Sequence, residues 1–271
     1  MFGTITIGAD PEAFVRTIAT KEVISAEGMI GGTKDEPLSI SEEGHAIQED
    51  NIMVEFNIPP SECQQSFTDN INYCKDYLNT LLAFDNCELA ILPSSEIDSK
   101  FLQTEQAKMF GCDPDINVYL KGYNKKPCST GTLRTCGGHI HIGMSNAHKV
   151  KFEYKEQLVM AMDAVLGLES LSLDSDDRRR ELYGNAGSFR IKSYGIEYRT
   201  LSNFWIENDE LMGWAYNKTL EAIELVESGV IVDIIDKYKS QIEECINNNN
   251  KKKSLKLLNK IKKITKTKIY K

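Results

Sequence analysis

Two of the four histidines stand two residues apart in the segment 137–143, which has glycine at both ends. Because side chains alternate along a β-strand, His139 and His141 share one face, while Ile140 and Ile142 share the other. Neutral imidazole binds metal ions, and its donor form suits a phosphate oxygen. The pattern predicts a strand that holds a metal, a nucleotide or both, with two purely structural histidines as the alternative.

Acidic side chains lie on, or directly after, other segments that are expected to form strands. Asp10 and Glu12 follow the alternating run 4–8, and Glu55 lies within the expected strand 52–58. Glu197 and Arg199 share a face by the period of two. Magnesium and manganese prefer carboxylate oxygens and tolerate an imidazole. If these strands line one cavity, the repulsion between their carboxylates favours a bound divalent cation, magnesium above all.

The elements that must position these residues do not alternate regularly between strand and helix. Helical spacing of apolar residues predicts helices over 67–84 and 151–168, and further strands are expected over 87–92 and 193–201. Two or three helices should close the chain, with breaks near 228–229 and 247–250. This order predicts an α+β fold with a mainly antiparallel sheet.

Length and charge suggest one large domain with an appendage. The 271 residues, 41% of them apolar, can bury a substantial core, and we expect a catalytic domain over 1–227 and a helical, lysine-rich extension over 228–271. The net charge is −8, but residues 251–271 contain ten lysines and no acid, which leaves −18 for the rest. Nucleic-acid binding by the whole surface is therefore not expected. The basic end should pack on the acidic body, although an anionic partner is the alternative.

The cysteines and the hydropathy pattern indicate a cytoplasmic protein. Seven cysteines occur without a Cys-x-x-Cys pair, which favours reduced thiols over disulfides or structural zinc. Neither a signal peptide nor an apolar run long enough to span a membrane is evident.

A resemblance brings the separate motifs together. Their order over residues 3 to about 215 resembles the phage carboxylate-amine (COOH-NH2) ligases of type 2, within the superfamily of glutamine synthetase and glutamate-cysteine ligase. The motifs are residues 8–14, 27–38, 50–51 with 55–57, 137–143 and 183–205.

The resemblance implies a curved antiparallel sheet forming a half-barrel, with helices on its outer face. It also implies an enzyme that uses ATP and Mg²⁺ or Mn²⁺ to phosphorylate a carboxylate, which an amine then attacks to give an amide or peptide bond. The substrates would be small molecules or peptides, and a homo-oligomer is possible. If the chain is encoded by a phage, its compartment would be the host cytoplasm.

Roles carried over from the family fall on nine residues. The metal ligands would be Asp10, Glu12, Glu55, His139 and Glu197, although the family more often has Glu where this chain has Asp10. His141, Arg190 and Lys34 would contact the nucleotide, and Arg199 and Arg190 would act on the substrate carboxylate or the transferred phosphate. The two histidines would exchange roles if the strand register differed.

Several alternatives remain open. Residues 31–34 lack the full P-loop spacing and are read as a turn near the cleft. Glu49 and Asp50 depend on where their strand starts, and one arginine of the run 178–180 could reach substrate. The rival functions are a nucleotide- or peptide-binding protein without turnover and, less favoured, a His-x-His metal-dependent hydrolase. Specificity should depend on loops such as 113–126.

Overall fold

The computed structural model describes residues 1–108, 115–125 and 131–268, which form an α+β fold. The strands are β1 (Ile5–Ala9), β2 (Glu12–Thr17), β3 (Val23–Ile24), β4 (Leu38–Ser39), β5 (Ala46–Asp50), β6 (Met53–Asn57), β7 (Cys87–Ala90), β8 (Ser94–Glu96), β9 (Ile116–Asn117), β10 (Gly122–Tyr123), β11 (Leu133–Thr135), β12 (Ile140–Met144), β13 (Ser188–Lys192) and β14 (Gly195–Tyr198). The α-helices are α1 (Gln64–Ala83), α2 (Glu105–Lys108), α3 (Phe152–Met162), α4 (Leu168–Leu173), α5 (Asp209–Glu227), α6 (Val230–Asn247) and α7 (Lys251–Lys268). Within these ranges no helix is both long and apolar enough to cross a bilayer.

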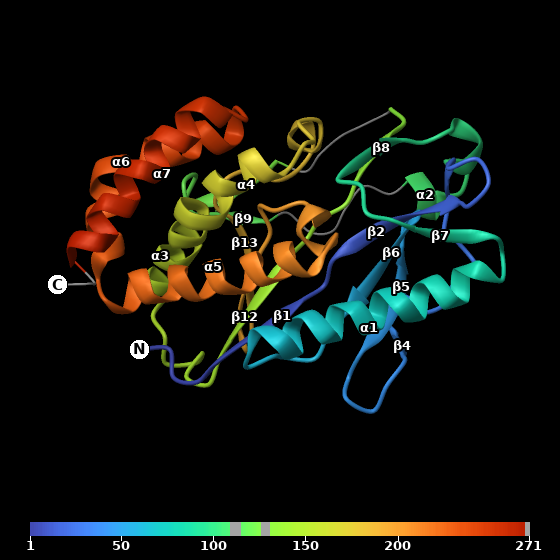
Figure 1. Cartoon of the computed structure of the whole chain (residues 1–271), viewed down its shortest axis with the longest axis horizontal. Helices are drawn as coiled ribbons and strands as arrows, with labels where there is room; N and C mark the ends of the chain where they lie inside the picture. The colour runs from blue at the N-terminus through green and yellow to red at the C-terminus, as the bar shows by residue number, and fades with distance from the viewer. Residues whose placement is uncertain (109–114, 126–130, 269–271) are drawn as a thin grey trace.

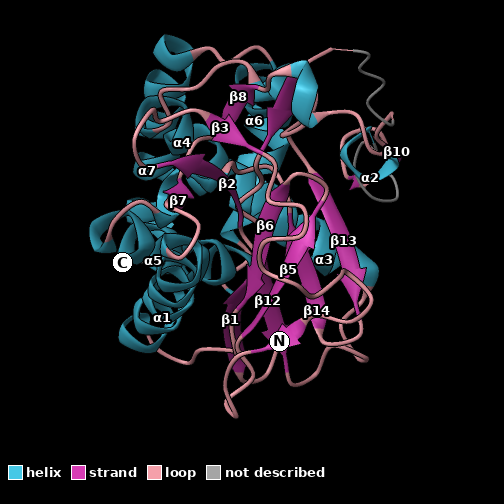
Figure 2. Ribbon diagram, turned by 90° about the vertical axis from the view of Figure 1, so that its right-hand side faces the viewer, coloured by secondary structure: helices cyan, strands magenta, loops and turns pink. Residues whose placement is uncertain are grey.

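The strands form two six-stranded sheets and one pair. One sheet has the order β1-β12-β14-β13-β9-β10, and the other has the order β3-β2-β6-β5-β4, with β7 also paired to β2. Every strand pair among the described residues is antiparallel, and the sheets are open. Figure 2 shows strands of both sheets in the middle of the molecule, with α1 and α5 to their left. The expected α+β class with a mainly antiparallel sheet is confirmed.

Strand register sets the polar face of the first sheet. His141 lies opposite Gly8 of β1 and opposite Glu197 of β14, and Glu197 in turn lies opposite Arg190 of β13. In the second sheet, β2 and β6 are neighbours, and Glu12 of β2 lies opposite Glu55 of β6. Because residues two apart along a strand share a face, these pairings fix which side chains can meet.

Helix α1 follows the expected apolar spacing. Its buried side chains include Phe67, Ile71, Leu78 and Leu82, and the thiol of Cys63 accepts a hydrogen bond from the first turn. Figure 1 shows α1 crossing in front of β5 and β6, with its axis roughly parallel to that of α5. The two helices contact each other, so they close one side of the core.

The expected helix 151–168 is longer than predicted and changes its pitch. Helix α3 continues through a π-helical turn at Asp163–Gly167 into α4, and Asp163 is fully buried there. Its carboxylate accepts a hydrogen bond of 2.6 Å from the Tyr198 hydroxyl on the back of β14. The sequence also predicted one strand over 193–201, whereas the chain forms a hairpin of β13 and β14 with its turn at residues 193–194.

The basic end of the chain packs on the body. Helices α6 and α7 lie together at one end of the molecule (Figure 1), and Leu257, Leu258 and Ile261 are buried in the main core. Lys253 Nζ donates to Glu244 on α6 at 2.6 Å. Three closing helices therefore form as expected, while the domain boundary at 227/228 remains a prediction.

Candidate functional site

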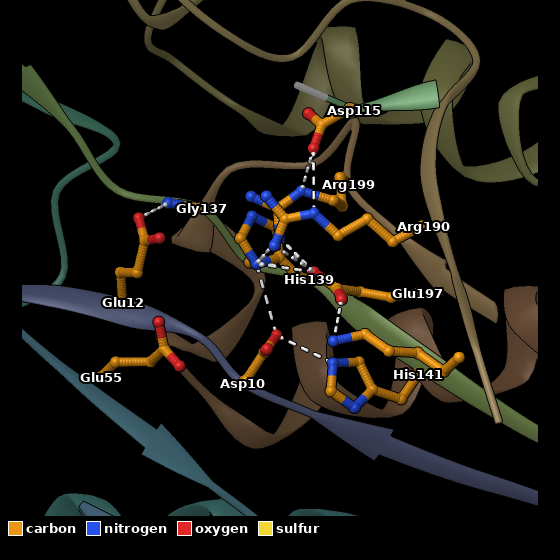
Figure 3. A network of polar contacts seen from close by, with 12 residues as sticks. Asp10, Glu12, Glu55, Asp115, Gly137, His139, His141, Arg190, Glu197 and Arg199 are labelled. Carbon is orange, nitrogen blue, oxygen red and sulfur yellow. Dashed lines mark hydrogen bonds and ion pairs between the residues drawn. The ribbon is translucent and has the colours of Figure 1, made fainter. Parts of the chain in front are cut away.

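A cavity of about 330 Å³ opens between the two sheets, and Figure 3 shows its polar side chains converging from several strands. Seven of the nine predicted site residues line it: Asp10, Glu12, Lys34, Glu55, His139, Arg190 and Arg199. The remaining two, His141 and Glu197, contact lining residues directly. Asp50, Gln48 and Lys192 line it as well.

The first group of potential metal ligands is Asp10, His141 and Glu197, whose donor atoms lie within 4.8 Å of one another. His141 Nε2 lies 3.0 Å from Asp10 Oδ1. Burial by itself would raise the pKa of Asp10, but the two histidines hold that pKa well below its usual value. Burial and Asp10 would likewise raise the pKa of Glu197, yet Arg199 and the histidines lower it to about 2. Both carboxylates therefore favour the ionised form, which is the form that binds a cation.

The second group is Glu12, Asp50 and Glu55, again with donor atoms within 4.8 Å. Glu12 and Glu55 come together because they are cross-strand partners. Burial and the neighbouring Glu12 raise the pKa of Asp50 to about 7. Such crowding of carboxylates is relieved when a cation is shared among them. The donor set, entirely of oxygen, fits magnesium or manganese.

Glu49 and Asp50, left open by the sequence, have different surroundings. The Glu49 carboxylate accepts backbone hydrogen bonds from Gly28, Ile30 and Gly31, at 3.0 to 3.3 Å. Glu49 thus holds the glycine turn, and Asp50 faces the cavity.

Cationic side chains form the opposite wall. Lys192 Nζ lies 2.7 Å from Glu197 Oε2, and the Arg199 guanidinium also contacts Glu197. Asp115 bridges the two arginines, with Oδ1 2.8 Å from Arg199 Nε and 3.4 Å from Arg190 Nε. Acids from the end of β1 and from β2, β5 and β6 therefore share the cavity with cations from β13 and the end of β14, and this arrangement suits a divalent cation together with an anionic ligand.

The two histidines have distinct contacts. His139 Nδ1 lies 3.1 Å from Arg199 Nη1 and 3.3 Å from Asp10 Oδ1. His141 Nδ1 is hydrogen bonded to the Tyr194 hydroxyl at 2.9 Å, which orients the ring so that Nε2 faces Asp10. The geometry groups His141 with a potential metal site, so the expected division of metal to His139 and phosphate to His141 remains a prediction.

Glycines before the His-x-His strand permit close packing. A Cβ at Gly137 would overlap the His139 imidazole, and a Cβ at Gly138 would overlap the Ser202 carbonyl and the Trp205 indole. The Trp205 Nε1 donates to the Gly138 carbonyl at 3.1 Å. Only glycine lets this turn hold His139 against the core.

Sequence reasoning missed Lys192 and Asp115. The signal for Lys192 was present, because it lies two residues after Arg190 on the same strand face. Asp115 precedes a two-residue strand, and its link to Arg199 depends on the fold. Arg134, which lies just before the His-x-His strand, is buried, and its guanidinium donates to the carbonyls of Gly131, Leu133 and Ala107.

Fold and site together define an open antiparallel α+β protein with facing carboxylate and guanidinium walls. Residues 132–266 match the family described as phage phiEco32-like COOH.NH2 ligase-type 2. This match confirms the resemblance to the type 2 carboxylate-amine ligases over residues 132–266. Asp10, Glu12, Lys34 and Glu55 lie outside the matched residues.

Comparison with curated proteins gave no match. Among solved structures, "Apo GmaS without ligand" aligns at 10% identity and a TM-score of 0.45, over 100% of this chain and 70% of the other. "Crystal structure of novel glutamine synthase homolog" aligns at 10% identity and a TM-score of 0.39, over 97% and 68% respectively.

Proposed function

We propose that this protein is an ATP-dependent carboxylate-amine ligase that forms an amide or peptide bond through an acyl phosphate. The observation that carries the proposal is that potential cation ligands and cationic side chains meet at one cavity. Two groups of potential cation ligands lie at this cavity together with Arg190, Lys192 and Arg199, and Glu197 links the first group to these cations. The ligase family matched by residues 132–266 supports the same chemistry.

The two ligand groups would each hold a magnesium or manganese ion. Asp10, His141 and Glu197 would form one site, with His139 beside it, and Glu12, Asp50 and Glu55 would form the other. When bound, the ions would neutralise the triphosphate and the charge that develops during phosphoryl transfer.

The chain's own contribution is positioning and charge. Arg199 and Arg190 would hold the substrate carboxylate and the phosphoryl oxygens, because a guanidinium offers paired donors and stays charged. Asp115 contacts both guanidinium groups through the same carboxylate oxygen, Oδ1, and so aligns them. Lys34, on the loop at the mouth of the cavity, would meet the outer phosphates. A carboxylate is a poor electrophile until phosphate becomes its leaving group, so holding these two groups together is the main task.

The test is metal-dependent release of phosphate from ATP in the presence of carboxylates and amines. Phosphate release should require Mg²⁺ or Mn²⁺ together with both substrates, and Glu197→Gln and His139→Ala should reduce it by about 100-fold or more. Glu96→Gln, at an exposed ion pair with Arg178, should leave it unchanged. ATP binding without phosphate release, across a broad panel of carboxylates and amines, would indicate a binding protein instead. Unchanged release in Glu197→Gln would refute the site.

A further inference from the structure

A second cavity, of about 380 Å³, shares no lining residue with the first. Its walls come from the β9–β10 segment, the turn after Arg179, and helix α6. They are mainly polar and include the carboxamides of Asn117, Asn124, Asn185 and Asn247. Its volume lies in the range of small-molecule pockets.

Strand register connects this cavity to the first. Asn117 of β9 lies opposite Ser188 of β13, and the Arg199 amide donates to the Ser188 carbonyl at 2.9 Å. Asn117, Ser188 and Arg199 therefore form one row across the sheet. The second cavity begins at the end of this row, beyond the cationic wall of the first.

The charged residues that line the second cavity are the cations Arg180 and Lys125 and the acids Glu181 and Glu243, and Arg180 is the guanidinium among them. Its Nη1 donates to the Gly184 carbonyl at 3.0 Å, which uses one of the five guanidinium donors. No carboxylate of the residues that the structure describes lies within 4.0 Å of it. Its neighbours in the run differ, since Arg178 pairs with exposed Glu96 and Arg179 is buried against the carbonyls of Cys136 and Thr200.

The carboxamides around Arg180 are held in place. Asn117 Nδ2 donates to the Ala186 carbonyl at 2.9 Å and to Asn124 Oδ1 at 2.8 Å, and Asn124 Nδ2 donates to the Ser188 hydroxyl at 2.8 Å. The Asn117 Oδ1 also accepts from the amides of Tyr119 and Leu120, so this carboxamide holds the wall in place, and the polar wall fits a polar ligand better than an apolar one.

We propose that this cavity binds a short peptide with a free carboxylate, anchored by Arg180, and that this peptide is the amine substrate. The inference rests on the proposed function for the fate of the peptide, but not for its binding. With the carboxylate at Arg180, the amino end would have to extend along the row of Asn117 and Ser188 to reach Arg199. There the amine nitrogen would bond to the acyl carbon, the bond from that carbon to the phosphate oxygen would break, phosphate would leave with the electron pair, and an amine proton would pass to water.

Binding is tested by calorimetry without ATP or metal, using Ala-Xaa dipeptides and the same dipeptides with amidated C-termini. The free dipeptides should bind, and amidation or Arg180→Gln should weaken binding at least about tenfold, as expected for loss of a charge-assisted contact. Arg178→Gln is the matched control and should bind like the wild type. Glu243→Gln removes a like charge from the same cavity, so it should bind the dipeptide at least as tightly as the wild type.

Two readouts separate this inference from the proposed function. In the ATP assay, Arg180→Gln should raise the KM for the dipeptide about tenfold with little change in kcat. Arg180→Lys, which keeps the charge, should recover part of the affinity and controls for a folding defect. Equal binding of free and amidated dipeptides, or wild-type affinity in Arg180→Gln, would overturn the inference. Dipeptide binding without ATP turnover would instead contradict the ligase activity.

Discussion

Asp115 Oδ1 lies 2.8 Å from Nε of Arg199, and the same oxygen lies 3.4 Å from Nε of Arg190. One carboxylate thus joins two guanidinium groups that come from different strands. Arg199 is 8% exposed and also contacts Glu197 and His139. The cationic wall of the cavity is therefore aligned by a residue that precedes β9, the strand next to the edge strand β10.

Asp115→Asn should lower ligation more than it lowers stability. The amide oxygen carries no full negative charge and so holds the two guanidinium groups more weakly, and a misplaced catalytic group costs up to about 100-fold in rate. We expect kcat to fall about 10- to 100-fold, while the urea midpoint changes little. Asp115→Glu restores the charge and should recover part of kcat. If Asp115→Asn and Asp115→Glu lose equal activity, charge at this position is not what matters.

Asp50 and Glu49 provide a matched pair for metal binding, because they are neighbours on β5 with different surroundings. Asp50→Asn removes a ligand and should weaken Mn²⁺ binding, measured by electron paramagnetic resonance, about tenfold or more. Glu49→Gln should leave Mn²⁺ affinity near the wild type but lower the melting temperature, since it weakens the hold on the turn at Gly28–Gly31. The reverse pattern would assign the ligand to Glu49.

Asp163 should make stability depend on pH. Burial raises the pKa of its carboxyl from 3.8 to about 7, against the hydrogen bond from Tyr198. In the unfolded chain the carboxyl loses its proton near 3.8, so between there and about 7 the folded state binds more protons. Its contribution to stability is therefore complete below the unfolded pKa and is lost as pH rises through the folded pKa, by at most about 1.4 kcal/mol per pH unit.

The measurement is urea unfolding of wild type and Asp163→Asn across this range. Asparagine keeps the acceptor oxygen but cannot ionise. As pH rises from about 4 to about 7, the free energy of unfolding of the variant should therefore increase relative to that of the wild type. Parallel stability curves for the two proteins would rule out ionisation of Asp163 as the cause.

The order of the elements and the same-face pairs could be predicted from sequence, because both follow from local periodicity. His139 with His141 and Glu197 with Arg199 are two apart on one strand, and the period of two suffices to group each pair. Contacts between side chains on different strands could not be predicted from this periodicity. The pairing of Glu12 with Glu55 depends on the register between β2 and β6, and the sequence reasoning relied on family resemblance for it.

Asp50 and Arg180 show what could not be predicted from the sequence. The direction of Asp50 depends on where β5 begins and on which neighbour binds the glycine turn, and both are tertiary facts. Arg180 was one of three adjacent arginines in the sequence, and only packing separates its cavity-facing guanidinium from the buried Arg179 and the ion-paired Arg178.

The central claim is that phosphate activates a carboxylate in this cavity. The direct measurement is to incubate the protein with ATP, Mg²⁺, an amine and a carboxylate substrate labelled with ¹⁸O in both carboxylate oxygens, and to examine the released phosphate by ³¹P NMR. An acyl phosphate requires one ¹⁸O to pass from the carboxylate to each phosphate released. Phosphate that carries the label, formed together with the amide, is the result we predict. Amide formation with unlabelled phosphate would contradict the account.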